Sequence, residues 1–201
     1  MLFVITGPSG CGKSTLVQRV LQEVDNLDFS VSYTTRSPRE SEQEGKDYYF
    51  ISRPEFQKLI DENKLVEWAL VHGHYYGTSK REIEKKGAQK DLILDVDVQG
   101  AEKLKSKFKK AVFIFVLPPR YAELKKRLSK RGEEPPEVIA QRLEVARKEI
   151  RYYPQFDYII INDKLDKAVK DLVSIILCTR CQLDFRKREI MLILRSFINN
   201  E

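Results

Sequence analysis

Residues 7–14 read Gly7-Pro8-Ser9-Gly10-Cys11-Gly12-Lys13-Ser14, and this stretch decides the fold. It matches the phosphate-binding pattern G-x-x-x-x-G-K-S. An apolar run at 2–5 precedes it, and from Thr15 onward apolar residues recur at helical spacing. The pattern therefore stands between a buried strand and the N-terminus of a helix, where backbone N–H groups and the helix dipole attract phosphate.

The side chains of this stretch add a cation and a hydroxyl to the loop. Lys13 can reach the β- and γ-phosphates of a nucleoside triphosphate, and Ser14 can offer its hydroxyl to Mg²⁺. A glycine turn beside a chance lysine is the alternative, which the strand and the helix on either side argue against. We therefore expect ATP to contact residues 7–15.

The composition is that of a globular protein with one domain. The chain has 201 residues, of which 42% are hydrophobic and 33% charged, and its net charge is +6. This charge suits an anionic small molecule, and no arginine-rich tail or aromatic-interleaved basic stripe favours nucleic acid. No apolar run approaches the about 20 residues that cross a bilayer, and no secretory signal precedes the first strand, so we expect no membrane partner.

The three cysteines do not form a disulfide framework, which favours a reducing, cytoplasmic setting. Cys178 and Cys181 form a single C-x-x-C, with no second pair nearby to complete a zinc site. Because this pair lies within an apolar helical pattern, we expect two small core residues on one helix face. The later run 190–194 is apolar all round, and either packs on the core or makes a subunit contact.

Apolar strands alternate with helical patterns along most of the chain. The expected strands lie at 2–5, 29–33, 92–97, 111–117 and 158–162. This alternation is typical of an α/β fold in which helices cover both faces of a parallel sheet. The segment 33–79 breaks the rhythm with short alternating strands and ends in an expected turn over 75–79. We interpret this segment as an inserted substrate lobe.

Two arginines stand three apart in a proline-containing turn of this lobe. The guanidinium groups of Arg36 and Arg39 suit a phosphate dianion, because each can donate two parallel hydrogen bonds. Tyr48 and Tyr76 could add hydroxyl donors. A solvated basic turn is the alternative, but the setting in an irregular lobe of a nucleotide-binding chain favours a second phosphate site.

Two acids end the strand expected at 92–97. Ligands of open α/β sheets bind beyond the carboxyl ends of the strands, so Asp95 or Asp97 can hold Mg²⁺ through water or hydrogen-bond a base. Capping of the next helix is the alternative. We expect a functional role for at least one of the two acids.

Arginines also flank a helix break at 132–136. Arg127 and Arg131 lie before it and Arg142 after it, as in a lid that brings cations to the phosphates on closing. A solvated helix face explains each arginine singly, but the set of three favours a lid.

With these motifs the chain resembles the guanylate kinase family. Between residue 4 and about residue 165 it carries, in order, the stretches G-P-S-G-C-G-K-S, S-V-S-Y-T-T-R-S-P-R, E-G-K-D-Y-Y-F, V-E-W-A, Y-Y-G-T, L-D-V-D-V-Q-G and R-L-x-x-R-G. The resemblance implies an α/β P-loop three-layer fold with a central parallel sheet, an inserted small mixed GMP-binding lobe and a helical lid. It also implies transfer of the γ-phosphoryl group of Mg-ATP to GMP and dGMP by a monomer or homodimer.

The resemblance divides the single domain 1–201 into three parts. The core would comprise about 1–32, 80–120 and 153–201, the GMP-binding lobe about 33–79, and the lid about 121–152.

The resemblance also assigns roles to individual residues. The GMP phosphate would be held by Arg36, Arg39, Tyr48 and Tyr76, and the guanine would be read by Ser32, Glu67, Thr78 and Asp97. ATP would contact the loop together with Arg127, Arg131 and Asn162. Catalysis would rest on Lys13, Arg39, Arg131 and Arg142. Mg²⁺ would be bound by Ser14, and by Asp95 through water.

Two other functions are open at this point. A kinase for AMP or UMP is disfavoured, because guanine presents adjacent N1–H and N2–H₂ donors that the Glu67 carboxylate can accept and adenine lacks that pair. A catalytically inactive module that binds protein ligands is disfavoured, because such modules lose the phosphate loop and this chain keeps Lys13 and Ser14.

Overall fold

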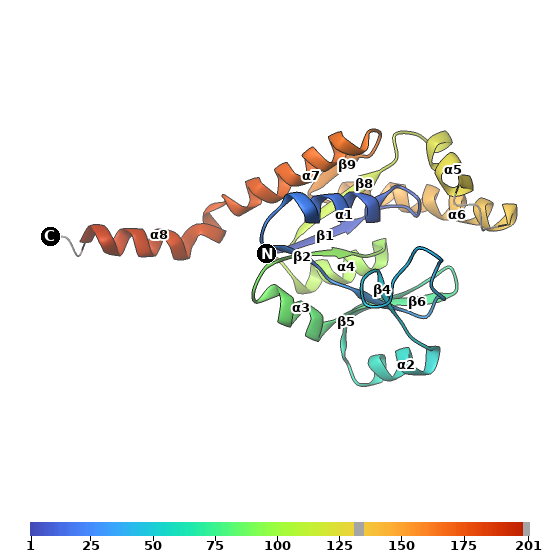
Figure 1. Ribbon diagram of the computed structural model, residues 1–201, viewed down its shortest axis with the longest axis horizontal. Helices are drawn as coiled ribbons and strands as arrows, with labels where there is room; N and C mark the ends of the chain where they lie inside the picture. Colours follow the sequence, from blue (N-terminus) through green and yellow to red (C-terminus); the bar gives the residue numbers. More distant parts are fainter. Residues whose placement is uncertain (131–134, 199–201) are drawn as a thin grey trace.

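A sheet of five parallel strands lies at the centre of the molecule (Figure 1). The structure is a computed structural model that describes residues 1–130 and 135–198, so Arg131 lies outside the described residues. In spatial order the strands are β2 (Leu27–Phe29), β7 (Asp91–Asp95), β1 (Leu2–Thr6), β8 (Val112–Leu117) and β9 (Tyr158–Ile161). Because all of them run parallel, their carboxyl ends meet at one edge, where ligands bind in this fold class.

Helices cover both faces of this sheet, as the alternation along the chain predicts. One layer is formed by α1 (Lys13–Glu23) and α7 (Leu165–Arg180), and the other by α3 (Lys80–Gly87) and α4 (Val98–Lys107). Along β1, Phe3 and Ile5 join the first apolar cluster and Val4 joins the second, because successive residues of a strand point to opposite faces. The predicted three-layer α/β fold is confirmed.

A second, mixed sheet of four strands lies within the segment expected to form a substrate lobe, below the central sheet in Figure 1. In spatial order its strands are β4 (Tyr48–Phe50), β3 (Ser32–Thr34), β6 (His74–Ser79) and β5 (Leu65–Val71). The helix α2 (Arg53–Asp61) begins with a capping box, in which the Ser52 hydroxyl accepts from the Glu55 N–H and the Glu55 carboxylate accepts from the Ser52 N–H. The helix therefore begins with its first N–H groups paired by its own side chains.

The single strand expected over 29–33 is wrong. The chain leaves the first sheet after Phe29 and enters the second sheet at Ser32. Between them, the Ser30 N–H still donates to the Ile93 carbonyl at 2.9 Å, so the apolar alternation runs on while the backbone changes partners. The alternating pattern indicates which side chains are buried, and it does not show that they are buried by two different sheets.

The turn expected over 75–79 is also wrong, because these residues belong to β6. Gly77 suggested the turn, yet packing explains this glycine: a Cβ atom there would lie 3.0 Å from Leu65 and 3.0 Å from Phe56. Gly77 pairs with Trp68 across the β5–β6 ladder. The glycine therefore makes room for the lobe's apolar side chains.

Two helices form the region expected to be the lid. They are α5 (Tyr121–Lys130) and α6 (Pro136–Glu149), which pack through Leu124, Leu128, Leu143 and Ala146. The helix α6 is followed at Ile150 by a 3₁₀ segment, η1 (Ile150–Gln155), which contains Pro154.

The C-terminal helix α8 (Leu183–Ile198) projects away from the rest of the molecule (Figure 1). Cys178 and Cys181 lie where α7 ends, and both are exposed, so the expected core role for this pair is wrong. The buried face of α7 instead carries Ala168, Val169, Leu172, Ile176 and Thr179. Within the ranges 1–130 and 135–198, no helix has the length and apolar character needed to cross a membrane.

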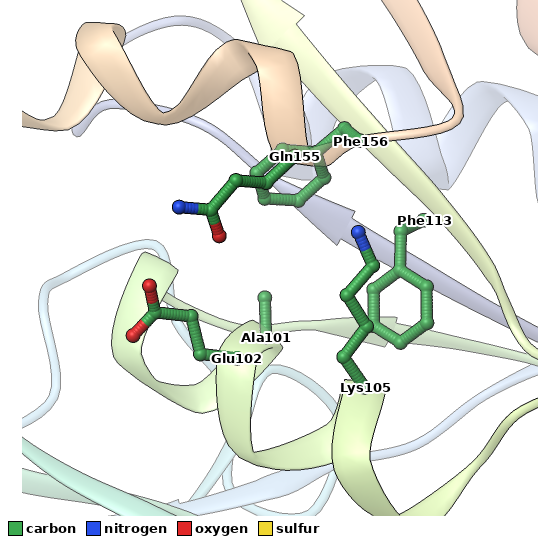
Figure 2. A pocket seen from close by; sticks show the side chains of 6 residues that line it. All are labelled: Ala101, Glu102, Lys105, Phe113, Gln155 and Phe156. Carbon is green, nitrogen blue, oxygen red and sulfur yellow. The ribbon is translucent and has the colours of Figure 1, made fainter.

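A small hollow lies between α4, β8 and η1 (Figure 2). The Lys105 ammonium approaches the rings of Phe113 and Phe156 there, at 5.3 Å and 5.8 Å from their centroids. The volume of the hollow, about 10 Å³, is close to that of a single water site. The hollow therefore belongs to the packing of α4 on the sheet.

Candidate active site

The backbone of the loop between β1 and α1 packs closely against β8 and the residue after β9. Gly12 has a φ of 95°, and a Cβ atom there would lie 2.4 Å from the Asn162 amide nitrogen. At Gly7 a Cβ atom would lie 2.2 Å from the Val116 carbonyl oxygen. Both glycines are therefore required by the close approach of the neighbouring strands as well as by the turn.

Two side chains hold the Cys11 carbonyl of this loop. Asn162, directly after β9, donates to it at 2.8 Å, and Arg127 of α5 donates to it at 3.3 Å. Arg127 also donates to the Asn162 carbonyl at 2.9 Å and to the Glu123 carboxylate at 3.1 Å. The two residues expected beside ATP therefore meet at the loop, and they fix the peptide that links Cys11 to Gly12.

Lys13 lies between the loop and the end of β7. Its ammonium donates to the Gly7 carbonyl at 2.7 Å and lies 3.7 Å from the Asp95 carboxylate. Burial lowers the pKa of Lys13, but the Asp95 carboxylate, together with Cys11, Glu149 and Tyr48, outweighs burial and raises the pKa above the ordinary value. The side chain stays protonated, so a fixed positive charge stands beside the loop.

Three of the four residues expected around the second phosphate come together directly. Arg36 donates through Nε to the Tyr76 hydroxyl at 3.3 Å, and its guanidinium lies 5.6 Å from the centre of the Tyr48 ring. The rings of Tyr48 and Tyr76 are 5.9 Å apart. Arg39 joins through an acid: the carboxylate of Glu42 accepts from Arg36 at 2.8 Å and from Arg39 Nη1 at 3.4 Å. We name these five residues the acceptor cage.

Glu42 was missed by the sequence reasoning. The charged segment that contains it resembles a solvated loop, and an acid near two arginines is common on surfaces. Its position three residues after Arg39 and six after Arg36 was the available signal.

A buried carboxylate stands where guanine recognition is expected. Glu67 on β5 is 5% exposed, and the Thr78 hydroxyl on β6 donates to it at 2.5 Å. Ser32, 7% exposed, lies on β3, whose next residue Tyr33 pairs with Gly77 of β6. Three of the expected residues thus lie on adjoining strands of the second sheet.

Asp97 connects this pair to the central sheet. It accepts from the Gly100 N–H at 2.9 Å and so caps α4, which was the alternative reading of this acid. Burial and the Asp97 charge raise the pKa of Glu67 to about 7, against the opposing effects of Thr78 and Lys103. Asp97 can therefore cap α4 and also lie beside the proposed guanine site.

Tyr48 joins the two halves of the site. Burial raises the pKa of its hydroxyl, and the charges that act on it come from Asp95 and Lys13 at the loop as well as from Arg36 of the cage. Tyr48 of the acceptor cage therefore lies near enough to the phosphate loop for the charges of Asp95 and Lys13 to act on it.

The end of α6 adds an acid that no motif predicted. Burial raises the pKa of Glu149 to about 7, with Asp97 raising it further and Lys13 lowering it. Arg142 of the same helix is half-buried. The last residue of the second lid helix thus lies near enough to the phosphate loop for the charge of Lys13 to act on it.

Comparisons with known proteins agree with this geometry. A sequence model described as guanylate kinase matches residues 1–178. Guanylate kinases of Geobacter metallireducens and Thermotoga maritima are each 46% identical over 183 residues, which is 90% of this chain and 90% and 88% of theirs. That of Clostridium tetani is 45% identical over 202 residues, 100% of this chain and 97% of its own. The crystal structure of guanylate kinase from Anaplasma phagocytophilum superposes with a TM-score of 0.77 at 30% identity, covering 91% of this chain and 87% of that one. The chain belongs to the guanylate kinase family.

Proposed function

We propose that the chain transfers the γ-phosphoryl group of Mg-ATP in line to GMP, and also to dGMP, giving ADP and GDP or dGDP. The family assignment supports this reaction. The observation that carries the residue assignment is Tyr48, on which charges from the phosphate loop and from Arg36 act together. A donor site and an acceptor site that lie near one another are what in-line transfer requires.

Charge neutralisation and positioning supply the catalysis in this proposal. The acceptor phosphate is already a nucleophile, so no general base is needed. Lys13 offsets the charge between the β- and γ-phosphates, and Arg39 holds the acceptor phosphate with Arg36, Tyr48 and Tyr76. Arg142, with Arg131 outside the described residues, adds cations from the lid on closing.

The bases are read at opposite ends of the site. Guanine meets Ser32, Glu67, Thr78 and Asp97, and the adenine of ATP lies beside Arg127 and Asn162. The closeness of Glu67 to Thr78, at 2.5 Å, supports the first assignment. The contacts of Arg127 and Asn162 with the loop support the second.

The oxygen donors near Lys13 fit Mg²⁺. Ser14 is exposed at the first turn of α1, and the Asp95 carboxylate stands 3.7 Å from the Lys13 ammonium, so a hydroxyl and a carboxylate lie beside the loop. In the described ranges no group of three or more His, Cys, Asp or Glu side chains could hold a metal alone, which fits an ion that takes most ligands from water and phosphate. We propose that Ser14 binds Mg²⁺ directly and Asp95 through water. Bound there, the ion would neutralise charge on the ATP phosphates.

A turnover panel tests the proposed reaction and its rivals. ADP release from ATP is measured with GMP, dGMP, AMP, UMP and CMP as acceptors. We expect turnover with GMP and dGMP. Faster turnover with AMP or UMP would identify another nucleoside monophosphate kinase, and no turnover with any acceptor would indicate a binding module.

The affinity for GMP is expected to fall as the pH drops through 7. The Glu67 carboxyl has a pKa of about 7, set by burial and Asp97 against Thr78 and Lys103. Guanine needs the ionised form, which accepts two hydrogen bonds, so protonation competes with binding. KM for GMP measured by steady-state kinetics should rise about tenfold between pH 8 and about pH 6.

The GMP phosphate also titrates, with a pKa of about 6. The variant Glu67→Gln is the control, because it keeps the phosphate titration and lacks the carboxyl. A pH profile of the same steepness in both proteins would contradict the assignment to Glu67.

We retain the proposed division of the chain into a core (1–32, 80–120, 153–201), a GMP-binding lobe (33–79) and a lid (121–152). The second sheet and the α5–α6 pair support the last two. We also propose a cytoplasmic setting, because all three cysteines are free thiols.

Of the two assemblies expected, we favour a homodimer built on α8. This helix exposes Leu183, Met191, Leu192, Ile193, Leu194, Phe197 and Ile198. Exposed apolar side chains on a projecting helix suit a twofold contact between identical helices. Light scattering should show a dimer for the full chain and a monomer for a chain that ends before Leu183. A monomeric full chain would exclude the contact.

A further inference from the structure

The carboxylate of Glu42 occupies the side of the acceptor cage formed by the two arginines. Nη2 of Arg36 donates to both of its oxygens, at 2.8 Å and 2.9 Å. The side chain is 13% exposed. Burial alone would raise its pKa, yet the bonds from Arg39 and Arg36 outweigh burial and hold the pKa below the ordinary value. Glu42 is therefore ionised wherever GMP carries its phosphate charge.

Glu42 is also anchored in its own turn. Its backbone N–H donates to the Arg39 carbonyl at 3.0 Å, while the Arg39 N–H donates to its carboxylate at 2.9 Å. This reciprocal pair closes the turn from both ends. Displacing the carboxylate would leave the Arg39 N–H without this partner, which favours a carboxylate that stays in place when a phosphate arrives.

The anchored carboxylate fixes the orientation of Arg36. The other two nitrogens of this guanidinium are also held: Nη1 donates to the Ser37 carbonyl at 2.6 Å, and Nε donates to the Tyr76 hydroxyl at 3.3 Å. Because the Tyr76 oxygen accepts from Arg36, its own O–H points elsewhere and is available as a donor to phosphate. One acid thus orders Arg36 directly and Tyr76 through Arg36.

We propose that Glu42 is a positioning residue for the acceptor phosphate, which holds Arg36 and Arg39 as one preorganised unit; this rests on the proposed transfer to GMP. A long arginine side chain samples many rotamers when free, and ordering it before the ligand arrives lowers the cost of binding. The carboxylate also reduces the formal charge of the two arginines from +2 to +1. The alternative is a carboxylate that occupies the place of the phosphate and competes with it.

The substitution Glu42→Gln separates these two roles by the sign of its effect. It keeps the size of the side chain but removes the charge and one acceptor oxygen. If Glu42 positions the arginines, KM for GMP should rise about tenfold, with KM for ATP and kcat within about threefold of the original values. If Glu42 competes with the phosphate, KM for GMP should fall, and the proposal is overturned.

Glu44→Gln is the matched control. Glu44 belongs to the same charged loop. Its carboxylate accepts from the backbone N–H of Phe50 at 2.9 Å, and among the hydrogen bonds of the described residues it accepts from no arginine. We expect its KM for GMP to match that of the unchanged protein. An equal rise in both variants would show that loop structure alone is responsible, and would overturn the proposal.

Calorimetric titration with GMP gives a second measurement that does not depend on turnover. If the unchanged chain binds GMP without phosphorylating it, the proposed function fails, while a Kd shift in Glu42→Gln and none in Glu44→Gln still supports the positioning role. Should Glu42→Gln fail to fold, Glu42→Asp keeps the charge but withdraws the carboxylate by one methylene. A raised Kd for GMP in that variant supports the proposal, and an unchanged Kd overturns it.

Discussion

Replacing Lys13 with methionine or alanine is expected to lower kcat by about 10³-fold while leaving the affinity for GMP within about threefold. The ammonium stands between the Gly7 carbonyl and the Asp95 carboxylate, 2.7 Å and 3.7 Å away. Its raised pKa keeps it charged, because Asp95, with Cys11, Glu149 and Tyr48, outweighs the effect of burial. The charge that develops between the transferred and the leaving phosphate would lose its fixed counter-charge. Steady-state kinetics with saturating GMP and a GMP titration by calorimetry measure the two effects separately.

Lys85→Ala is the control for this prediction. Lys85 is exposed on α3, far along the chain from the loop, so its removal changes the net charge without touching the site. Methionine in place of Lys13 preserves most of the side chain's volume and guards against a loss of packing. If Lys13→Met turned over GMP at a near-normal rate, the proposed mechanism would be wrong.

Replacing Glu67 with glutamine is expected to reduce kcat/KM for GMP by about 10²-fold or more, with KM for ATP unchanged. The carboxylate offers two acceptor oxygens to the adjacent donors of guanine. A glutamine amide offers one acceptor and one donor, and that donor would face a donor of guanine. The same amide complements the donor and acceptor of adenine, so the ratio of kcat/KM for GMP to that for AMP should fall further. Kinetics with both nucleotides measures the ratio.

The stability of this variant should move in the opposite direction. Burial and Asp97 raise the pKa of Glu67 from 4.5 to about 7, so the folded chain holds this proton more tightly than the unfolded chain. The ionised carboxylate therefore destabilises the unliganded fold increasingly as the pH rises from 4.5 to about 7, and fully above it. Glutamine removes that cost, and the melting temperature at about pH 8 should not fall. A variant that lost both activity and stability would contradict a role confined to recognition.

The parts of the fold that local sequence determines were predicted well. The strand, glycine loop and helix at 2–23 appear as expected, because glycine spacing and apolar periodicity act within a few residues. The central parallel sheet followed from alternating apolar runs.

The errors arose where tertiary contacts, rather than local sequence, determine the structure of a segment. The segment 29–33 alternates as one strand, yet it serves two sheets, and periodicity cannot tell which neighbour a buried residue meets. Gly77 suggested a turn, although its role is to leave room for Leu65 and Phe56 from elsewhere in the lobe. Cys178 was expected in the core because its neighbours are apolar, but the packed face of α7 passes through Ile176 and Thr179.

The sequence predicted the side chains that would bind the ligands better than it predicted the acids that accompany them. The residue types that bind phosphate follow from chemistry, so Arg36 and Tyr76 could be named from the sequence, whereas Glu67 was named through the family resemblance. The acids that accompany them could not, because Glu42 and Glu149 are defined by approach in space and belong to no motif. The individual ligand roles remain predictions.

Among residues 1–130 and 135–198, the three apolar clusters share no residue, and this has a consequence for how the protein opens. The α5–α6 cluster consists of Leu124, Leu128, Leu143 and Ala146, with Ile139 at its edge, whereas each sheet face buries more side chains. A unit with so few buried contacts opens at a lower free energy than the global fold, so in amide exchange α5 and α6 should behave as a separate foldon. Arg142 is thus carried by a weakly held part of the molecule, while Lys13 belongs to a strongly held one. Opening of this pair would also break the bonds of Arg127 with the Cys11 and Asn162 carbonyls, so the proposed release of product would loosen the phosphate loop at the same time.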